Sequence, residues 1–415
     1  LNTLSLDGLN ATRTWSGAYC EPPTAFSIAS NTLAPLRGRF ICPWGRSAEP
    51  GYANGGNKFD LATWDPAYFK RLKDFVGQAG KRGVIVELNL FCPFYDESMW
   101  ELSPMNARNN VNGIGSLART NVYTLDKNGA LLRVQEDMVR KIVTELKGFD
   151  NVYYEICNEP YFGGVTAEWQ RHIADIITET ELPFRAHHLI SQNIANDKAL
   201  VQNPHPEVSV FNFHYATPPE TVGLNYGLRR VIGDNETGFR GTNDASYRME
   251  AWDFIAAGGG LFNNLDYSFT AGHEKGTFRY PSSQPGGGSA ELRRELKFLA
   301  TTMQSLDFVR MQPANGVVHA KLPPGASVRV LAWPGEQYLV YLHGPKDQPG
   351  DARSGYREGE ITLDLTLPSG AFKAQWLEPR ACRPRATSRF THWEGAQSFS
   401  VPAFDQDIAL VVRRN

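Results

Sequence analysis

As far as about residue 310, the hydrophobic residues of the chain follow a strand-like pattern and a helical pattern in turn. Short runs rich in β-branched and aromatic residues have the composition of strands, and the segments between them carry apolar residues at helical spacing. After Asp65-Pro66, for example, apolar residues at positions 69, 72, 75, 76 and 79 form one helical face. The strand-like runs begin near residues 9, 84, 152, 187, 208, 230 and 260. Strands that alternate with helices in this way are typical of an α/β domain.

The pattern changes after about residue 313. Short alternating runs replace the helical segments, and turn residues such as Pro-Gly and Pro-Ser-Gly separate them. These runs cover residues 327–333, 337–343, 360–367, 372–377, 388–393 and 408–413. We therefore predict a domain at 1–312 and an antiparallel β-sandwich at 313–415. The sandwich could bind carbohydrate or serve as a structural cap, and the lack of an aromatic row favours the cap.

Two of the predicted strands end on a glutamate. The run from residue 151 stops at Asn158-Glu159-Pro160, because proline cannot donate a hydrogen bond to a strand ladder. The run from residue 230 reaches Glu236 and is broken by the Thr-Gly pair that follows. A single Asn-Glu-Pro could equally be a strand-end carboxylate that caps the next segment. The second glutamate favours a catalytic pair.

An Asn-Glu-Pro after one strand and a glutamate after a later strand resemble the retaining glycoside hydrolases of clan A. The resemblance is closest to glycoside hydrolase family 5 and its relatives, over roughly residues 9–310. It implies a (β/α)8 TIM barrel with its catalytic groups at the C-terminal ends of the strands. It also implies double displacement at the β-glycosidic bonds of an oligo- or polysaccharide. Glu159 would be the acid/base and Glu236 the nucleophile, with carboxyls ~5 Å apart and no cofactor.

The same resemblance implies further site residues. Arg13 would hydrogen-bond the nucleophile, Asn158 would bond a sugar hydroxyl, and His214 would lie at a strand tip. The family's His-x-Tyr is here His214-Tyr215, so the usual bond from this tyrosine to the nucleophile is in question. Period two places Asn89 on the same side as Glu87, and Arg13 is a candidate partner for such a buried carboxylate. Five aromatic side chains are candidate sugar platforms, of which at least two should line one groove: Trp15, Trp44, Phe94, Trp100 and Tyr267.

The strand count gives one more expectation. In clan A the Asn-Glu-Pro glutamate follows strand four and the nucleophile follows strand seven. Counting back from Glu159 leaves strand one outside the numbered chain, so we expect residues 1–8 to be the tail of a helix. The segments 17–60 and 92–129 are expected to be long loops, which are usually functional inside a compact domain.

Composition limits the partners of the chain. The formal net charge is −2 without a block of like charge, so nucleic acid and anionic membranes are poor partners. Aromatic residues make up 12% of the chain and include nine tryptophans, which suits stacking on sugars. No apolar run has the length of a membrane-spanning helix. We expect a secreted or periplasmic protein, although the numbered chain shows no signal peptide; its oligomeric state is open.

Five cysteines are an odd number, so at least one is free or pairs between chains. One bridge among Cys20, Cys42 and Cys92 is possible, and Cys157 is expected to be a small buried hydrophobe. No Cys/His spacing matches a zinc site, so no metal is expected.

Two other function classes stay open. One is a carbohydrate-binding protein on a glycosidase scaffold without turnover, against which the paired glutamates argue. The other is a structural or adhesion protein that acts through residues 314–415.

Overall fold

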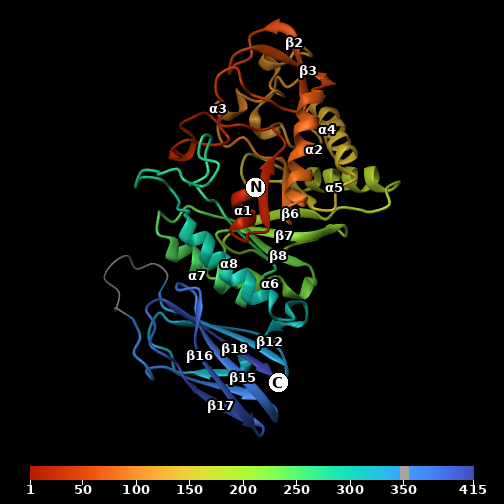
Figure 1. The fold of residues 1–415 in the computed structure, drawn as a ribbon. Helices are drawn as coiled ribbons and strands as arrows, with labels where there is room; N and C mark the ends of the chain where they lie inside the picture. Colours follow the sequence, from red (N-terminus) through yellow and green to blue (C-terminus); the bar gives the residue numbers. More distant parts are fainter. Residues whose placement is uncertain (346–354) are drawn as a thin grey trace. The chain divides into compact units, whose positions relative to one another are not determined.

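The computed structural model describes residues 1–345 and 355–415. These residues form two compact units (Figure 1). The first unit comprises Leu1–Leu6, Asn10–His214 and Tyr267–Pro285, and the second comprises Asp7–Leu9, Tyr215–Asp266 and Gly286–Asn415. The predicted domain boundary at residues 312/313 stays a prediction.

The first unit contains five parallel strands in the order in which they occur along the chain. They are β1 (Ala11–Trp15), β4 (Ile85–Phe91), β5 (Val152–Cys157), β6 (Ile190–Asn196) and β7 (Val208–His214). The connections carry α2 (Pro66–Gly80), α4 (Leu131–Leu146) and α5 (Ala167–Glu181). Asp65 caps α2 by accepting hydrogen bonds from the amides of Ala67 and Tyr68, and Thr166 caps α5 in the same way. The apolar faces of these helices are buried, as their spacing predicts.

The segment 17–60, expected to be a loop, contains a β-hairpin instead. Strand β2 (Trp44–Pro50) pairs antiparallel with β3 (Asn57–Trp64), and Trp44 lies opposite Trp64. Its glycine- and proline-rich sequence concealed the strand period, because the register shifts twice along the pair.

The segment 92–129, also expected to be a loop, contains short helices in the described structure. The short elements of this unit are α1 (Asn2–Leu6), α3 (Glu97–Trp100), η1 (Ala25–Ser27), η2 (Ala107–Asn109) and η3 (Arg119–Asn121). Helix α1 confirms that the first residues are helical.

The second unit begins with a parallel pair of strands, β8 (Val231–Thr237) and β9 (Leu261–Asn264). Its helices are α6 (Glu220–Asn225), α7 (Asp244–Ala256) and α8 (Ala290–Gln304), with η4 (Tyr226–Leu228), η5 (Phe308–Arg310) and η6 (Asn315–Val317). Over the described residues, the parallel sheet has seven strands in the order β1-β4-β5-β6-β7-β8-β9. Seven parallel strands that alternate with helices confirm the predicted TIM-barrel class.

Two antiparallel sheets follow at the C-terminal end, drawn in blue in Figure 1. Six strands form one sheet in the order β10-β12-β13-β18-β15-β16, and three form the other in the order β11-β14-β17. Buried residues of both sheets, among them Val340, Leu365 and Phe399, form one hydrophobic cluster. The bounds are β10 (Gln312–Pro313), β11 (Val318–Ala320), β12 (Ser327–Trp333), β13 (Gln337–His343), β14 (Thr362–Leu367), β15 (Gly370–Glu378), β16 (Arg383–His392), β17 (Gly395–Ser400) and β18 (Asp407–Arg414).

A buried ionic network joins α7 and α8 to the six-stranded sheet. Arg248 of α7 is 2% exposed and donates to Asp407 of β18 at 2.9 Å and to Glu295 of α8 at 3.1 Å. The hydroxyl of Tyr341 also donates to Asp407, at 3.0 Å. Apolar residues of the same helices and sheet, such as Trp252, surround this network in one cluster. The polar groups are therefore paired where the helices meet the sheet.

All five cysteines are free thiols. The bridge considered among Cys20, Cys42 and Cys92 is not formed, and each of the three side chains is buried. Cys157 is fully buried in β5, as predicted. Over the described residues, none of the helices combines the length and the apolar character needed to cross a membrane.

Candidate active site

Glu159 follows the C-terminal end of β5 in a left-handed backbone conformation, with φ of 38°. This region is uncommon for a residue with a side chain, and it is tolerated where the surroundings fix the backbone. The amide of the preceding residue, Asn158, donates to the carbonyl of Phe91 on β4 at 2.9 Å. Strand β5 ends at Cys157, and Pro160, which has no amide hydrogen, follows Glu159 and cannot extend the ladder. The turn therefore holds a nearly buried carboxylate, 8% exposed, at the end of a parallel strand.

Among the described residues, the side chains of Tyr95, Tyr161 and His214 contact the Glu159 carboxylate. The hydroxyl of Tyr95 donates to Oε2 at 2.5 Å, and the hydroxyl of Tyr161 donates to Oε1 at 3.3 Å. Nδ1 of His214, at the end of β7, lies 3.1 Å from the same Oε1. Burial, the nearby Cys92 and the charge of Glu159 raise the pKa of Tyr95, so its hydroxyl keeps the proton that it donates. The carboxylate is thus oriented from several sides.

Tyr95 and Tyr161 were not among the predicted site residues. Tyr95 lies in the long segment after β4, and its sequence neighbours gave no periodic signal. Tyr161 directly follows Pro160, and its position after the strand-end motif was the available clue. The Tyr161 hydroxyl also lies 2.5 Å from Oδ1 of Asn196 at the end of β6, so its single proton is shared between this oxygen and Oε1 of Glu159.

Arg13 of β1 is the centre of a buried network with side chains of β4, of β5 and of the segment after β5. Its Nε donates to Glu87 at 2.8 Å, and its Nη2 lies 2.8 Å from Oδ1 of Asn158 and 3.4 Å from Glu155. The predicted pairing of Arg13 with the buried carboxylates is therefore confirmed. Asn89 joins the same network, since its Oδ1 lies 3.5 Å from Nη2 of Arg13.

Two carboxylates share one guanidinium in this network. Burial is the main cause that raises the pKa of Glu155 to about 7, and the charge of Glu87 is the second cause. Further hydrogen bonds reach Glu155 from Asn212 at 2.6 Å and from Ser191 at 3.4 Å. The network therefore fixes Arg13 and Asn158 while it retains a group that titrates near neutral pH.

Glu236 lies near the end of β8 in the second unit and is 8% exposed. The hydroxyl of Tyr215 donates to its Oε1 at 2.6 Å. The shortened His-Tyr spacing had put this bond in question, and that doubt was wrong. Tyr215 adopts a left-handed conformation, φ 55°, and its amide donates to the carbonyl of Glu236 at 3.0 Å. This local geometry lets the residue adjacent to His214 reach the carboxylate.

The separation of the Glu159 and Glu236 carboxyls stays a prediction, as does a bond from Arg13 to Glu236. The role of Asn158 toward a sugar hydroxyl also stays a prediction. Its side chain accepts from Arg13 and donates to the hydroxyl of Tyr95 at 3.1 Å. It is therefore positioned beside the carboxylate of Glu159.

Three of the five predicted sugar platforms are buried, so the prediction is wrong for them. Trp44 is 1% exposed, Phe94 0% and Trp100 3%. The rings of Phe94 and Trp100 pack at 4.9 Å between centroids, and the indole of Trp100 donates to the carbonyl of Leu117. A sugar ring needs a free aromatic face, which these packed rings do not offer.

Trp15 and Tyr267 are partly exposed, and their proposed stacking roles stay predictions. The guanidinium carbon of Arg13 lies 5.1 Å from the ring centroid of Trp15. The indole is therefore placed beside the Arg13 network.

A second aromatic group surrounds Tyr95. Phe26 and Phe162 pack against the Tyr95 ring with centroids 5.2 Å and 5.7 Å away, and Tyr161 packs against Phe162 at 5.0 Å. The exposed fractions are 41% for Phe26, 37% for Tyr161 and 42% for Phe162. Exposed rings of this kind beside a carboxylate suit stacking on a sugar better than the buried rings that the sequence suggested.

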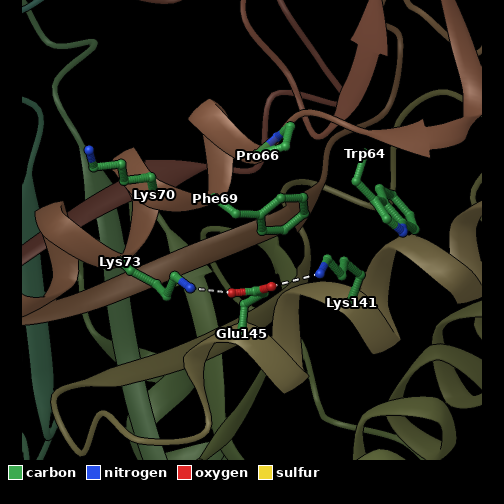
Figure 2. A pocket seen from close by; sticks show the side chains of 7 residues that line it. All are labelled: Trp64, Pro66, Phe69, Lys70, Lys73, Lys141 and Glu145. Carbon is green, nitrogen blue, oxygen red and sulfur yellow. Dashed lines mark hydrogen bonds and ion pairs between the residues drawn. The ribbon is translucent and has the colours of Figure 1, made fainter.

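A pocket of the first unit lies over α2 and α4. Figure 2 shows Glu145 between Lys73 and Lys141, at 2.5 Å and 2.6 Å, beneath the rings of Trp64 and Phe69. None of the residues around Glu159 lines it. The Lys73–Glu145 pair links α2 to α4, whereas the Lys141–Glu145 pair lies within α4. The pocket is no part of the candidate active site.

Residues 4–195 match the family model described as Cellulase (glycosyl hydrolase family 5). This match confirms the resemblance to that family and supports glycoside hydrolase activity. The matched residues include Arg13, Asn158 and Glu159. No curated protein matches the chain.

Solved structures resemble the whole chain. One is a glycoside hydrolase family 5 protein from Bacteroides vulgatus, with a TM-score of 0.62 and 12% identity, covering 100% of this chain and 84% of that one. A second Bacteroides vulgatus protein, provisionally described as a glycoside hydrolase, has a TM-score of 0.64 and 14% identity over 100% and 74% of the two chains. A third structure, described as a glycoside hydrolase, has a TM-score of 0.62 and 11% identity over 100% and 87%. At these identities the likeness shows the fold.

Proposed function

We propose that this glycoside hydrolase, matched to family 5 over residues 4–195, cleaves β-glycosidic bonds of an oligo- or polysaccharide with retention of configuration. Glu159 is the acid/base, and Glu236 is the nucleophile. The contacts of two consecutive residues carry the proposal. His214 contacts the Glu159 carboxylate, and Tyr215 donates to the Glu236 carboxylate.

Retention needs two carboxyls with different tasks. In the first step, Glu236 attacks the sugar carbon while Glu159 gives its proton to the leaving oxygen, so that a glycosyl-enzyme ester forms. In the second step, Glu159 takes a proton from water, which attacks the same carbon and releases Glu236. The two carboxyls must be ~5–5.5 Å apart for this route, since a wider gap admits a water and inverts the product.

The surroundings of each glutamate support these tasks. Tyr215 donates to an oxygen of Glu236, which favours the charged form that a nucleophile needs. Tyr95, Tyr161 and His214 orient Glu159 toward a leaving group. Arg13 and Tyr95 hold Asn158, whose amide would bond the sugar hydroxyl next to the reacting carbon.

The test is a screen of aryl β-glycosides and β-linked polysaccharides, with proton NMR of the first-formed anomer. We expect the β-anomer first, no measurable turnover from Glu236→Gln, and an α-glycosyl azide when azide is added to Glu236→Ala. Glu145→Gln, which changes a carboxylate of the helical pocket, is the matched control and should keep activity.

An α-anomer as the first product would contradict retention. Full activity of Glu236→Gln would contradict the assigned nucleophile. A wild-type chain that binds the polysaccharides without hydrolysing any of them would support the alternative of a carbohydrate-binding protein.

A further inference from the structure

One face of the six-stranded sheet carries three cations in a row. On β15, Phe372, Ala374 and Trp376 point into the buried cluster between the C-terminal sheets, so Lys373 lies on the opposite face. In the strand register, Lys373 lies directly opposite Arg389 of β16 and Arg413 of β18. We call Arg389, Lys373 and Arg413 the basic row.

Like charges directly opposite each other on neighbouring strands repel, because such side chains have Cβ atoms only ~4.5–5.5 Å apart. Within the described part of the chain, neither Lys373 nor Arg389 forms an ion pair with a carboxylate. Arg413 donates to the hydroxyl of Ser305, and its Nε is buried without an acceptor in the same part of the chain. The basic row therefore holds uncompensated charge.

The same strand shows that compensation is possible. Arg383 and Arg385, at the other end of β16, both bind Glu378 of β15, at 2.8 Å and 2.6 Å. The difference between the two ends of β16 distinguishes the basic row from an ordinary charged strand. Arg383 and Arg385 therefore serve as matched controls for the basic row.

The strand register continues across the sheet beyond the basic row. Arg413 lies opposite Gln337 of β13, which lies opposite Trp333 of β12. The Trp333 ring packs against the buried cluster of α7, α8 and the sheet, and Arg310 lies over it with its guanidinium carbon 4.7 Å from the centroid. With a strand spacing of ~4.8 Å, the five strands from Trp333 to Arg389 span roughly 19 Å.

Hydrogen-bonding side chains lie next to the basic row. One step along β15 on the same face, Gln375 donates to the hydroxyl of Thr387 at 3.2 Å. The amide of Gln337 contacts Asp307, at 3.3 Å from its carboxylate. The face therefore combines cations, amide and hydroxyl groups, an aromatic ring and one carboxylate at its β13 end.

We propose that this face binds a polysaccharide that carries repeated carboxylates, a polyuronate. This inference rests on the proposed function, because that function assigns a glycan as the substrate of the chain. Guanidinium groups bind carboxylates through paired hydrogen bonds, and amides and hydroxyls bond sugar hydroxyls. A net charge of −2 over the chain gives no broad positive field for nucleic acid.

The experiment measures binding by the full chain with Glu236→Gln, so that hydrolysis does not interfere. The probes are polygalacturonate and the same polymer fully methyl-esterified, compared by titration calorimetry and affinity electrophoresis. We expect polygalacturonate to bind and the ester to bind at least about tenfold more weakly, since esterification removes the charge-assisted bonds.

Three variants locate the binding face. Lys373→Gln with Arg389→Gln should weaken binding of polygalacturonate about tenfold, and Arg383→Gln with Arg385→Gln should change it less than about twofold. Arg389→Glu, at an exposed position, should abolish binding while it raises the thermal midpoint of unfolding, because it removes a like-charge contact. This variant keeps the test valid if the double variant is poorly folded.

Equal binding of the ester and the acid would overturn the proposal, as would unchanged binding by Arg389→Glu. Binding of double-stranded DNA at least as tight as that of polygalacturonate, lost in Arg389→Glu, would assign the face to nucleic acid instead. Turnover of aryl glycosides by the wild-type chain is measured separately. A failure there contradicts the proposed function without affecting the binding result.

Discussion

The Tyr215 hydroxyl donates to Oε1 of Glu236 over 2.6 Å, although Tyr215 directly follows His214. His214 in turn contacts Oε1 of Glu159 at 3.1 Å. The last residue of β7 and the residue after it thus contact two different glutamates. Tyr215 itself adopts a left-handed backbone conformation, with φ of 55°.

Removing the Tyr215 hydroxyl should impair catalysis without unfolding the chain. We expect Tyr215→Phe to lower kcat/KM on an aryl β-glycoside about 10- to 100-fold, since a hydrogen bond to a charged nucleophile is lost. Tyr226→Phe, at an exposed tyrosine of η4, is the control and should have wild-type kinetics. Wild-type kinetics for Tyr215→Phe would contradict a role in positioning Glu236.

Tyr95 should matter most when the leaving group needs protonation. Tyr95→Phe removes the bond to Oε2 of Glu159, so the acid is less well oriented toward the leaving oxygen. We expect a larger loss of kcat on glycosides with poor leaving groups than on a dinitrophenyl glycoside. Tyr123→Phe is a matched control, because that buried hydroxyl has no hydrogen-bond partner among the described residues. Equal losses on all substrates would argue against the acid-positioning role.

The exposed and the buried aromatic residues should respond differently to truncation. Phe162→Ala should raise KM for an oligosaccharide about tenfold with little change in the free energy of unfolding, because an exposed stacking face is lost. Trp100→Ala should instead lower that free energy by about 3–5 kcal/mol, since it leaves a cavity. Denaturant unfolding and steady-state kinetics measure the two effects. An unchanged KM for Phe162→Ala would remove this ring from the substrate site.

Glu155 should make the stability of the fold depend on pH. Its pKa is raised in the folded chain from 4.5 to about 7, so the folded state binds the proton more tightly than the unfolded state. Between about pH 4.5 and 7, the contribution of Glu155 to the unfolding free energy should therefore fall as the pH rises. Glu155→Gln should remove this slope in a comparison of unfolding curves with wild type, whereas Asp126→Asn, at an exposed site, should leave it. A slope that persists in Glu155→Gln would assign it to other groups.

Arg248 should be important for stability in the second unit. Arg248→Met leaves Asp407 and Glu295 buried without their cation, and we expect a loss of about 3–5 kcal/mol in unfolding free energy. Arg294→Met, which breaks an exposed pair with Glu291, should cost less than about 1 kcal/mol. Similar losses for both variants would show that burial does not determine the effect. Chemical denaturation gives both values.

Much of the parallel sheet could be predicted from the sequence. The runs near Val152 and Val208 alternate in composition because each residue of a strand faces either the core or the helices, and this local period is written in the chain. The polar residues at the strand ends, Glu159 and Glu236, stood out because a proline or a Thr-Gly pair follows them. The same reasoning found Arg13 as a partner for buried carboxylates, since a buried charge requires one.

The surroundings of those residues were decided by the tertiary structure. Tyr95 reaches Glu159 across 64 residues of sequence, and no local pattern encodes such a contact. Trp100 and Phe162 are both aromatic residues in loops, yet one is buried and the other exposed, because exposure depends on what packs against each ring. Lys373, Arg389 and Arg413 follow one another at intervals of 16 and 24 residues and lie on three different strands, and only the register of β15 with β16 and β18 brings their charges together. Sequence period fixes which face of a strand a side chain takes, whereas long-range packing fixes its neighbours, and the neighbours determine charge state, exposure and chemistry.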